Sequence, residues 1–329
     1  MSAAQAFRLG TRGSQLALCQ ARMVSGRLAE AGATRCEVVV IRTSGDKLQD
    51  RPLSEAGGKN LFVKELEDAL LSGEIDLAVH SSKDLPAVLP GGLTIAGVLP
   101  REDPRDAVVL PARFTHGSIA TLDALVAALG PTPSIGTGSI RRVAQLTRVF
   151  RGATFAPIRG NLDTRLKKLD SGDHDALVLA VAGLRRLGLG ERVTLALPPT
   201  TCLPAPGQGI VAIETRMDDA DLRAAIAAIS DPGAGSALEA ERAMVAELGG
   251  GCQTPIGALA TPVDEEALEL AAIVVAVDGS RMVGTVVRGP RAQAAALGER
   301  AARQLVADGA GDILMEASRR HGAGAGPRS

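Results

Sequence analysis

Three segments of the chain combine residue types that can do chemistry. The first, Ser81-Ser82-Lys83-Asp84, directly follows the apolar run Ile75–His80. Residues just beyond the carboxyl end of a parallel strand line the ligand site of open α/β sheets, so Asp84 is a candidate for an ionised carboxylate with a functional role. The alternative is a helix cap beside a solvated Lys83–Asp84 ion pair. Position alone favours that alternative.

The second segment, residues 139–168, carries eight basic residues and one acidic residue in a chain whose net charge is −1. The basic residues are Arg141, Arg142, Arg148, Arg151, Arg159, Arg165, Lys167 and Lys168. Thr137-Gly138-Ser139 and Gly160-Asn161 precede expected helices, where free backbone N–H groups and the helix dipole favour anions. Arginine forks bind carboxylates and phosphates through paired hydrogen bonds. The arginines nearest these helix starts, Arg141, Arg142, Arg159 and Arg165, are predicted to contact an anionic ligand. The two lysines fit a solvated helix face.

The third segment is Gly249-Gly250-Gly251-Cys252-Gln253. Three glycines give the backbone the freedom to form an exposed loop, with a cysteine at its tip that is open to covalent chemistry. The alternative is a buried cysteine that acts as a small hydrophobic residue, which is the commoner case for a lone cysteine. No histidine lies in the neighbouring sequence to activate the thiol, so a cysteine hydrolase is not indicated.

Composition narrows the class of protein. A length of 329 residues predicts two or three domains, and 46% hydrophobic residues suffice for packed cores. The net charge of −1 and an aromatic content of 2% argue against a nucleic-acid-coating protein. The four cysteines and four histidines are scattered, which indicates neither a metal site nor a disulfide framework. With no signal-like N-terminus and no long apolar run, we expect a soluble cytoplasmic enzyme that binds no membrane.

Short apolar runs alternate with helical patterns through the first two thirds of the chain, which predicts α/β units with a mostly parallel sheet. The expected strands are Phe7–Thr11, Glu37–Arg42, Ile75–His80, Ala107–Leu110, Ser134–Thr137, Phe155–Ile158 and Ala176–Ala180. Expected helices run from the N-cap Ser14 to Glu30, over Leu61–Leu71 and Leu122–Leu129, and from Ser139 and Asn161.

Two interruptions suggest domain boundaries. The charged segment Arg101–Arg105 and the turn-forming segment Leu203–Gly209 separate an expected first domain (residues 1–99 and 210–227) from a second (105–203). The strand Ile210–Thr215 can return to either. A helix, a hairpin through Asp278-Gly279-Ser280 and a last helix from residue 291 to about 308 predict a small α+β domain at 232–320. Residues 321–329 are predicted to be a disordered tail.

At this point the motifs resemble one family, the porphobilinogen deaminases (hydroxymethylbilane synthases). The resemblance runs in order from about residue 7 to residue 260, and its motifs are several residues long. They are RLGTRGSQLAL at 8–18, GGKNLFVKE at 57–65, AVHSSKDLP at 78–86, REDPRDA at 101–107, IGTGSIRR at 135–142, IRGNLDTRL at 158–166, LAVAGLRRL at 179–187, LPAPGQG at 203–209 and ERAMVAELGGGCQTPIG at 241–257. Ser82 and Gly138 depart slightly from the usual pattern without removing a charged group.

The resemblance implies an α/β fold with two lobes like those of periplasmic binding proteins, plus a small α+β C-terminal domain. It implies a dipyrromethane cofactor, made from two substrate units and attached to Cys252 through a thioether. It makes Asp84 the catalytic residue and requires no metal. The implied cofactor contacts are Ser81, Lys83, Asp84, Thr137, Ser139, Arg141 and Arg142. The implied substrate contacts are Arg12, Ser14, Gln20, Arg159, Arg165, Arg186 and Gln208.

The implied reaction joins four porphobilinogen molecules on the cofactor with loss of ammonia, and hydrolysis then releases hydroxymethylbilane. Asp84 would stabilise the cationic pyrrole intermediates, and the arginines would hold the acetate and propionate groups. We expect a monomer whose partner is the small-molecule substrate. Two alternatives remain: an anion-binding protein without catalysis, because fold alone does not decide function, and a nucleic-acid-binding protein that uses the arginines. Cys252 and the third domain argue against the first, and the scarcity of aromatic residues against the second.

Overall fold

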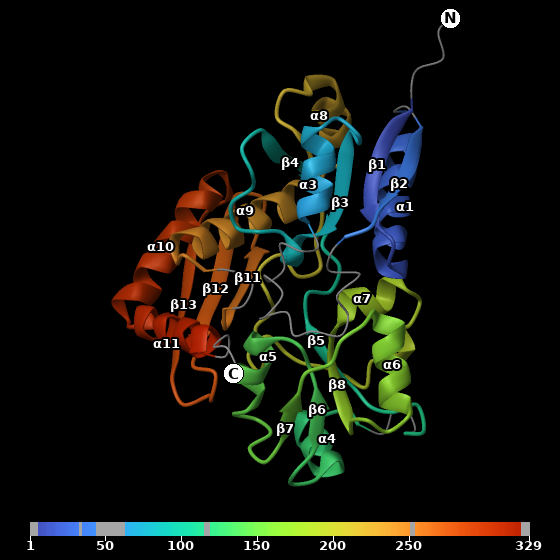
Figure 1. Ribbon diagram of the computed structural model, residues 1–329. Helices are drawn as coiled ribbons and strands as arrows, with labels where there is room; N and C mark the ends of the chain where they lie inside the picture. Colours follow the sequence, from blue (N-terminus) through green and yellow to red (C-terminus); the bar gives the residue numbers. More distant parts are fainter. Residues whose placement is uncertain (1–5, 33–34, 44–62, 115–118, 251–253, 324–329) are drawn as a thin grey trace, which may run out of the picture.

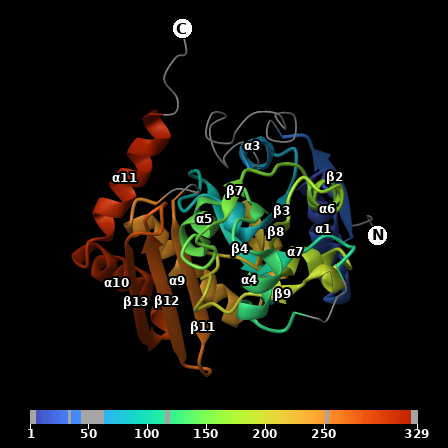
Figure 2. The same ribbon diagram turned by 90° about the horizontal axis from the view of Figure 1, so that it is seen from below.

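The computed structural model describes residues 6–32, 35–43, 63–114, 119–250 and 254–323. Each of three regions is built around its own sheet. Figure 1 shows two α/β lobes, one above the other, with the third region beside them, and Figure 2 shows the same arrangement from below. The predicted fold class, two α/β lobes and a small α+β domain, is confirmed. The exact domain boundaries stay a prediction, which the three separate sheets support.

The first lobe has a five-stranded sheet in the order β2-β1-β3-β10-β4. Its strands are β1 (Phe7–Arg12), β2 (Cys36–Ile41), β3 (Leu77–Ser81), β4 (Leu93–Val98) and β10 (Val211–Arg216). Its helices are α1 (Gln15–Glu30), α3 (Lys64–Leu71) and α8 (Ala220–Ala227), with a 3-10 turn η2 (Ser82–Asp84). Strand β1 is parallel to β2 and β3, whereas β10 is antiparallel to β3 and β4. The strand predicted after the second interruption therefore returns to the first lobe.

The second lobe repeats this pattern in the order β7-β6-β8-β5-β9. Its strands are β5 (Asp106–Val109), β6 (Ser134–Gly136), β7 (Thr154–Ala156), β8 (Ala176–Ala180) and β9 (Leu195–Ala196). Its helices are α4 (Leu122–Leu129), α5 (Ile140–Leu146), α6 (Leu162–Asp170) and α7 (Val181–Arg186), with a 3-10 turn η3 (Gly190–Arg192). Strand β6 is parallel to β7 and β8, and β5 is antiparallel to β8 and β9. In both lobes, three parallel strands are followed by one antiparallel strand and an edge strand.

The third region packs helices against a three-stranded antiparallel sheet, β11-β12-β13. The elements are α9 (Pro232–Glu247), β11 (Ile256–Pro262), β12 (Ala267–Val275), β13 (Met282–Pro290), η4 (Arg291–Gln293), α10 (Ala294–Ala307) and α11 (Ala310–Ala323). The predicted hairpin is confirmed, because Val275 pairs with Met282 across the turn. The predicted last helix is not the last one: α11 follows α10 and reaches Ala323, so the start of the predicted tail at 321–323 is helical. Apolar positions of α11 pack into the core, which the sequence analysis did not recognise.

Helix α1 shows how local sequence forms these elements. Ser14 caps it, and its hydroxyl accepts a hydrogen bond from the Ala17 backbone N–H at 3.3 Å. Ala17, Ala21, Val24 and Leu28 recur at helical spacing and are buried, so one face of α1 packs on the sheet. The cap and the apolar stripe together place the start of α1 at the end of β1.

The crossing between the lobes depends on Gly209. This residue has φ +91°, and a Cβ atom there would lie 2.3 Å from the Glu102 carbonyl oxygen. Only glycine adopts this conformation without strain and also permits so close an approach. The two crossing segments therefore run directly against each other, and the predicted turn in Leu203–Gly209 is confirmed at residues 206–209.

Candidate functional site

The predicted site residues lie where strands of both lobes end. Arg12 is the last residue of β1, and Ser81 is the last residue of β3, directly before η2 with Lys83 and Asp84. In the second lobe Thr137 follows β6, and Ser139 is the N-cap residue of α5. The carboxyl ends of parallel strands meet at one edge of a sheet, so the alternating strand–helix sequence brings these residues together within each lobe.

On the first-lobe side, one amide group positions a hydroxyl. Gln20 of α1 is 2% exposed, and its Nε2 donates a hydrogen bond to Ser81 Oγ at 2.9 Å. This contact links α1 to the end of β3, directly before the Lys83–Asp84 turn. The Ser14 hydroxyl serves as the cap of α1, so its predicted contact with substrate stays a prediction beside this structural role.

On the second-lobe side, Arg141 and Arg142 are buried and share one carboxylate. Arg142 donates to Asp106 Oδ1 from Nε at 3.0 Å and from Nη2 at 2.7 Å. Arg141 Nη1 lies 2.8 Å from Asp106 Oδ2. Burial alone raises the pKa of Asp106, but the two guanidinium groups outweigh it and hold the pKa below its ordinary value. Their predicted role as cofactor contacts stays a prediction, and the structure adds a buried counter-ion for both.

Across the lobes, Arg165 of α6 interacts with Asp84. Burial, together with the charges of Arg142 and Arg159, lowers the pKa of Arg165 to about 10, although the charge of Asp84 opposes this shift. Its Nε donates to the Gly160 carbonyl oxygen at 2.8 Å, which holds the side chain against its own loop. The carboxylate predicted to be catalytic, in the first lobe, therefore interacts electrostatically with an arginine of the second.

Arg186 and Gln208 connect the two lobes at the crossing. Arg186 Nη2 donates to the Gly209 carbonyl oxygen at 2.6 Å, and burial lowers the pKa of Arg186. Cys19 of α1 donates from its Sγ to the Arg186 carbonyl oxygen at 3.1 Å. Gln208 is 1% exposed and lies between Lys83 Nζ, 3.5 Å from its Oε1, and Asp106 Oδ1, 2.8 Å from its Nε2.

Two buried carboxylates, which no local sequence pattern indicates, organise this region. Asp106 lies 36 residues before Arg142, so no local spacing connects them, and it reduces the charge excess counted for residues 139–168. Glu241 of α9 forms an ion pair with Arg101, whose Nη1 lies 2.6 Å from Glu241 Oε1. The same Oε1 accepts a hydrogen bond from the backbone N–H of Ala260 in β11 at 2.7 Å. Both acids lie in the REDPRDA and ERAMVAELGGG motifs, which are the only sequence signal that could have pointed to them.

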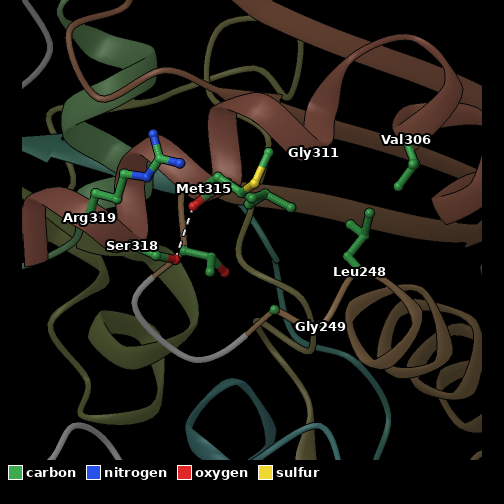
Figure 3. Close-up of a pocket in the computed structure, with 10 residues that line it drawn as sticks. Leu248, Gly249, Val306, Gly311, Met315, Ser318 and Arg319 are labelled. Atoms are coloured by element: carbon green, nitrogen blue, oxygen red, sulfur yellow. Dashed lines mark hydrogen bonds between the residues drawn. The ribbon is translucent and has the colours of Figure 1, made fainter. Parts of the chain in front are cut away.

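Cys252 lies outside the described residues. A cavity of about 540 Å³ lies among the ends of α9, α10 and the helix α11 (Figure 3). Its lining is mostly apolar, with Leu248, Val306, Leu314 and Met315, and includes Arg319. None of the described site residues lines it, so this cavity is separate from the arginine cluster.

Two further observations concern the described part of the chain. No group of three or more His, Cys, Asp or Glu side chains there is arranged to hold a metal ion. Within the same ranges, none of the helices combines the length and hydropathy of a transmembrane segment.

The fold and the site define a two-lobed α/β protein with buried arginines near the ends of its strands. Residues 7–224 match the family described as "Porphobilinogen deaminase, dipyromethane cofactor binding domain", and residues 236–307 match "Porphobilinogen deaminase, C-terminal domain". The chain belongs to the porphobilinogen deaminase family. The predicted family and dipyrromethane cofactor are thereby confirmed, and the chain is an enzyme of this family.

Curated relatives agree over nearly the whole length. The porphobilinogen deaminase of Bordetella parapertussis is 47% identical over 96% of this chain and 98% of its own. The porphobilinogen deaminase of Nitrobacter hamburgensis is 48% identical over 90% of this chain and 92% of its own.

Solved structures give more distant likenesses. The periplasmic VFT2 domain of Bordetella pertussis BvgS aligns with a TM-score of 0.39 and 15% identity, over 68% of this chain and 86% of its own. A putative methionine-binding lipoprotein from Bacillus subtilis aligns with a TM-score of 0.39 and 14% identity, over 68% of this chain and 90% of its own. Likenesses at this level carry no information about function.

Proposed function

We propose that this chain is a hydroxymethylbilane synthase, a transferase that condenses four porphobilinogen molecules with release of ammonia and then releases the linear product by hydrolysis. The observation that carries the proposal is the place of Asp84 in the turn directly after β3, where it interacts electrostatically with Arg165 of the second lobe. Several arginines suit a substrate that carries two carboxylates, and the carboxylate of Asp84 suits one that becomes cationic during the reaction.

The donor set fits the cofactor. Among the described residues, Arg141 Nε and Arg186 Nε are buried and find no hydrogen-bond acceptor. Burial and two neighbouring arginines lower the pKa of Arg165, so an added anion would stabilise its charged form. Bound carboxylates would satisfy these groups, since guanidinium forks match carboxylates in paired geometry. We propose that Ser81, Lys83, Thr137, Ser139, Arg141 and Arg142 hold the dipyrromethane, and that Cys252 carries it.

When bound, the dipyrromethane supplies the free pyrrole α-carbon on which the product is built. We propose that Arg12, Arg159, Arg165 and Arg186 hold the carboxylates of incoming substrate, with Ser14, Gln20 and Gln208 as polar neighbours. Asp84 accepts hydrogen bonds from pyrrole N–H groups and stabilises positive charge as ammonia leaves. Each added unit brings two more carboxylates, and arginine stays protonated throughout, so the site remains attractive to the growing product.

The proposal includes a monomer that acts in the cytoplasm and binds neither membrane nor nucleic acid. The near-neutral net charge of −1 supports the absence of nucleic-acid binding, because a protein that coats anionic polymers usually carries a large positive charge. The test for nucleic acid is a gel-retardation experiment over a range of salt concentrations.

Intact-mass measurement on the isolated full-length chain tests the function. We expect the wild type to be heavier than its sequence by one dipyrromethane and to gain substrate masses when porphobilinogen is added. Cys252→Ala should lose both gains and all product formation, because the growing chain then has no anchor. Cys36→Ala, which changes a half-buried thiol in β2, is the matched control and should retain the added mass. A Cys252→Ala protein that keeps the mass would refute the proposed attachment.

A further inference from the structure

We propose that Asp106 is a positioning residue, which holds Arg141, Arg142 and Gln208 in the geometry that binds the carboxylates of the dipyrromethane. This inference rests on the function proposed above. Asp106 is the first residue of β5, directly after the segment that crosses from the first lobe to the second. It is not among the residues assigned to substrate or cofactor.

The carboxylate of Asp106 is fully enclosed and fully used. Its side chain is 0% exposed. Oδ1 accepts hydrogen bonds from Arg142 Nε, Arg142 Nη2 and Gln208 Nε2, at 3.0, 2.7 and 2.8 Å. Oδ2 lies 2.8 Å from Arg141 Nη1 and accepts from Cys202 Sγ at 3.4 Å. A carboxylate offers about four lone-pair positions, so Asp106 has little capacity left for a ligand of its own. Its effect must pass through the side chains it binds.

Those side chains are held from a second direction as well. Arg142 Nη1 donates to the Val178 carbonyl oxygen at 2.7 Å, which fixes the guanidinium plane between Asp106 and β8. Arg141 Nη1 donates to the Leu203 carbonyl oxygen at 2.7 Å. Each guanidinium has five N–H donors, so both retain donors beyond these contacts. A side chain that is already ordered loses less conformational entropy when it binds a ligand.

Charge supports the same role. The carboxylate of Asp106 lies between the guanidinium groups of Arg141 and Arg142, so the three groups together keep one net positive charge. The carboxylate stabilises the two buried arginines, and the remaining positive charge still attracts anions. Burial raises the pKa of the neighbouring Cys202 thiol to about 12, so this group stays protonated and adds no second negative charge.

Asp106 also connects the two lobes. Gln208 Nε2 donates to Asp106 Oδ1 and to the Pro104 carbonyl oxygen, at 2.8 and 2.7 Å. The Oε1 atom of the same amide faces Lys83 Nζ of the first lobe at 3.5 Å. Gln208 is thereby fixed in one orientation, with its oxygen toward Lys83, the neighbour of Asp84. One buried carboxylate therefore aligns cofactor-binding groups on both sides of the crossing.

The competing explanation is purely structural: Asp106 offsets the buried charge of two arginines and does nothing else. Under that explanation, a substitution lowers the melting temperature, but each molecule that folds still takes up the cofactor normally. Cofactor occupancy of the folded fraction separates the two explanations, because it does not depend on how much protein folds.

The test uses the full-length chain as wild type, Asp106→Asn, Asp106→Glu and Glu214→Gln. Glu214 is the matched control, since it is 0% exposed and pairs with His80 rather than with a site arginine. For the folded fraction of each, we measure the intact mass as isolated and after limiting porphobilinogen is added, the melting temperature, and KM and kcat separately. Asp106→Asn should need about 10- to 100-fold more porphobilinogen for equal occupancy, the range found when partners that orient metal ligands are removed.

Two comparisons sharpen the result. Asp106→Glu restores the charge and should recover part of the occupancy, although the longer side chain displaces the carboxylate. Glu214→Gln should leave occupancy unchanged, whatever its effect on the melting temperature. In Asp106→Asn combined with Arg142→Gln, the loss should be smaller than the product of the two single losses, because Asp106 acts through Arg142. Losses that multiply would contradict the proposal.

Full occupancy of folded Asp106→Asn at wild-type porphobilinogen concentrations overturns the positioning role. If Asp106→Asn yields no folded protein, Asp106→Glu decides: reduced occupancy supports the proposal and full occupancy refutes it. A wild type that takes up no mass from porphobilinogen refutes the proposed function itself. A loaded wild type beside a loaded Asp106→Asn refutes only the role of Asp106.

Discussion

The two lobes place a buried carboxylate on corresponding strands, but they surround it with different partners. Glu214 lies on β10 and Asp106 on β5, the antiparallel fourth strand of each sheet, and both are 0% exposed. Asp106 is bound by two arginines and an amide. Glu214 has His80 Nε2 at 3.0 Å without hydrogen-bond geometry, and Glu67 of α3 nearby.

The different partners of Asp106 and Glu214 shift the pKa values in the two groups of buried side chains in opposite directions. The arginines hold the pKa of Asp106 below its ordinary value, although burial acts in the other direction. In the first lobe, burial and the charge of Glu214 raise the pKa of Glu67 from 4.5 to about 7, while His80 opposes the shift. The corresponding strands thus carry a permanent ion cluster in one lobe and a proton-binding cluster in the other, at different places along the strand: Asp106 pairs with the last residue of β8, and Glu214 with the second residue of β3. The charged partners within reach decide which kind of cluster forms.

Arg141→Leu tests the ion cluster and has the largest expected effect. Removing one partner of a buried ion pair costs up to about 3–5 kcal/mol of stability, and the loss here should lie below that limit, because Arg142 still pairs with the buried Asp106. We also expect poor cofactor content. Chemical denaturation and intact mass measure the two effects.

Arg159 provides the comparison, because no buried carboxylate pairs with it among the described residues. Arg159→Leu should change stability by less than about 1 kcal/mol and keep the cofactor, yet stall turnover. Full cofactor and normal turnover in Arg141→Leu would contradict this division.

Asp84→Asn tests the point where the first lobe meets the arginines of the second. Loss of a preorganised electrostatic partner costs about 100- to 1000-fold in rate, or roughly 3–4 kcal/mol, so turnover should fall by at least about two orders of magnitude with the fold intact. Asp84→Glu should be milder, since it keeps the charge. If Asp84 only stabilises its turn, Asp84→Asn would lower stability by about 1 kcal/mol and leave the single-turnover rate near normal.

Glu67→Gln tests the proton-binding cluster and has the smallest expected effect. Below about pH 4.5, Glu67 is protonated in both folded and unfolded chains. Between about pH 4.5 and 7 the unfolded chain loses this proton first, so the raised pKa costs stability as the pH rises, and the cost is complete above about pH 7. The amide cannot ionise and escapes this loss.

We therefore expect the stability of Glu67→Gln relative to wild type to rise by about 1–3 kcal/mol between pH 4 and pH 8. Denaturation at a series of pH values measures it. Glu30→Gln, at the exposed end of α1, is the control and should show no such trend. A stability difference that does not vary with pH would remove the contrast between the two buried clusters.

The sequence by itself determined most of the local structure. Alternating apolar runs and helical patterns located most strands and helices of both lobes, and Ser14 marked the start of α1, because periodicity and capping act within a few residues. The motifs located the family. Strands β4, β9 and β11 and helices α7, α8 and α11 were not predicted, since their local patterns are weaker and packing against other elements stabilises them.

Only the tertiary structure decided which charges meet. Strand β10 joins the first sheet although it follows the second lobe in sequence, and this places Glu214 beside His80. Asp106 binds Arg142 and Gln208 over separations of 36 and 102 residues. Ion pairing and burial depend on distance in space, and a local sequence pattern carries no information about groups so far apart along the chain. The sequence could therefore single out Arg141 and Arg142 as predicted site residues, whereas their shared counter-ion Asp106 became visible only in the folded chain.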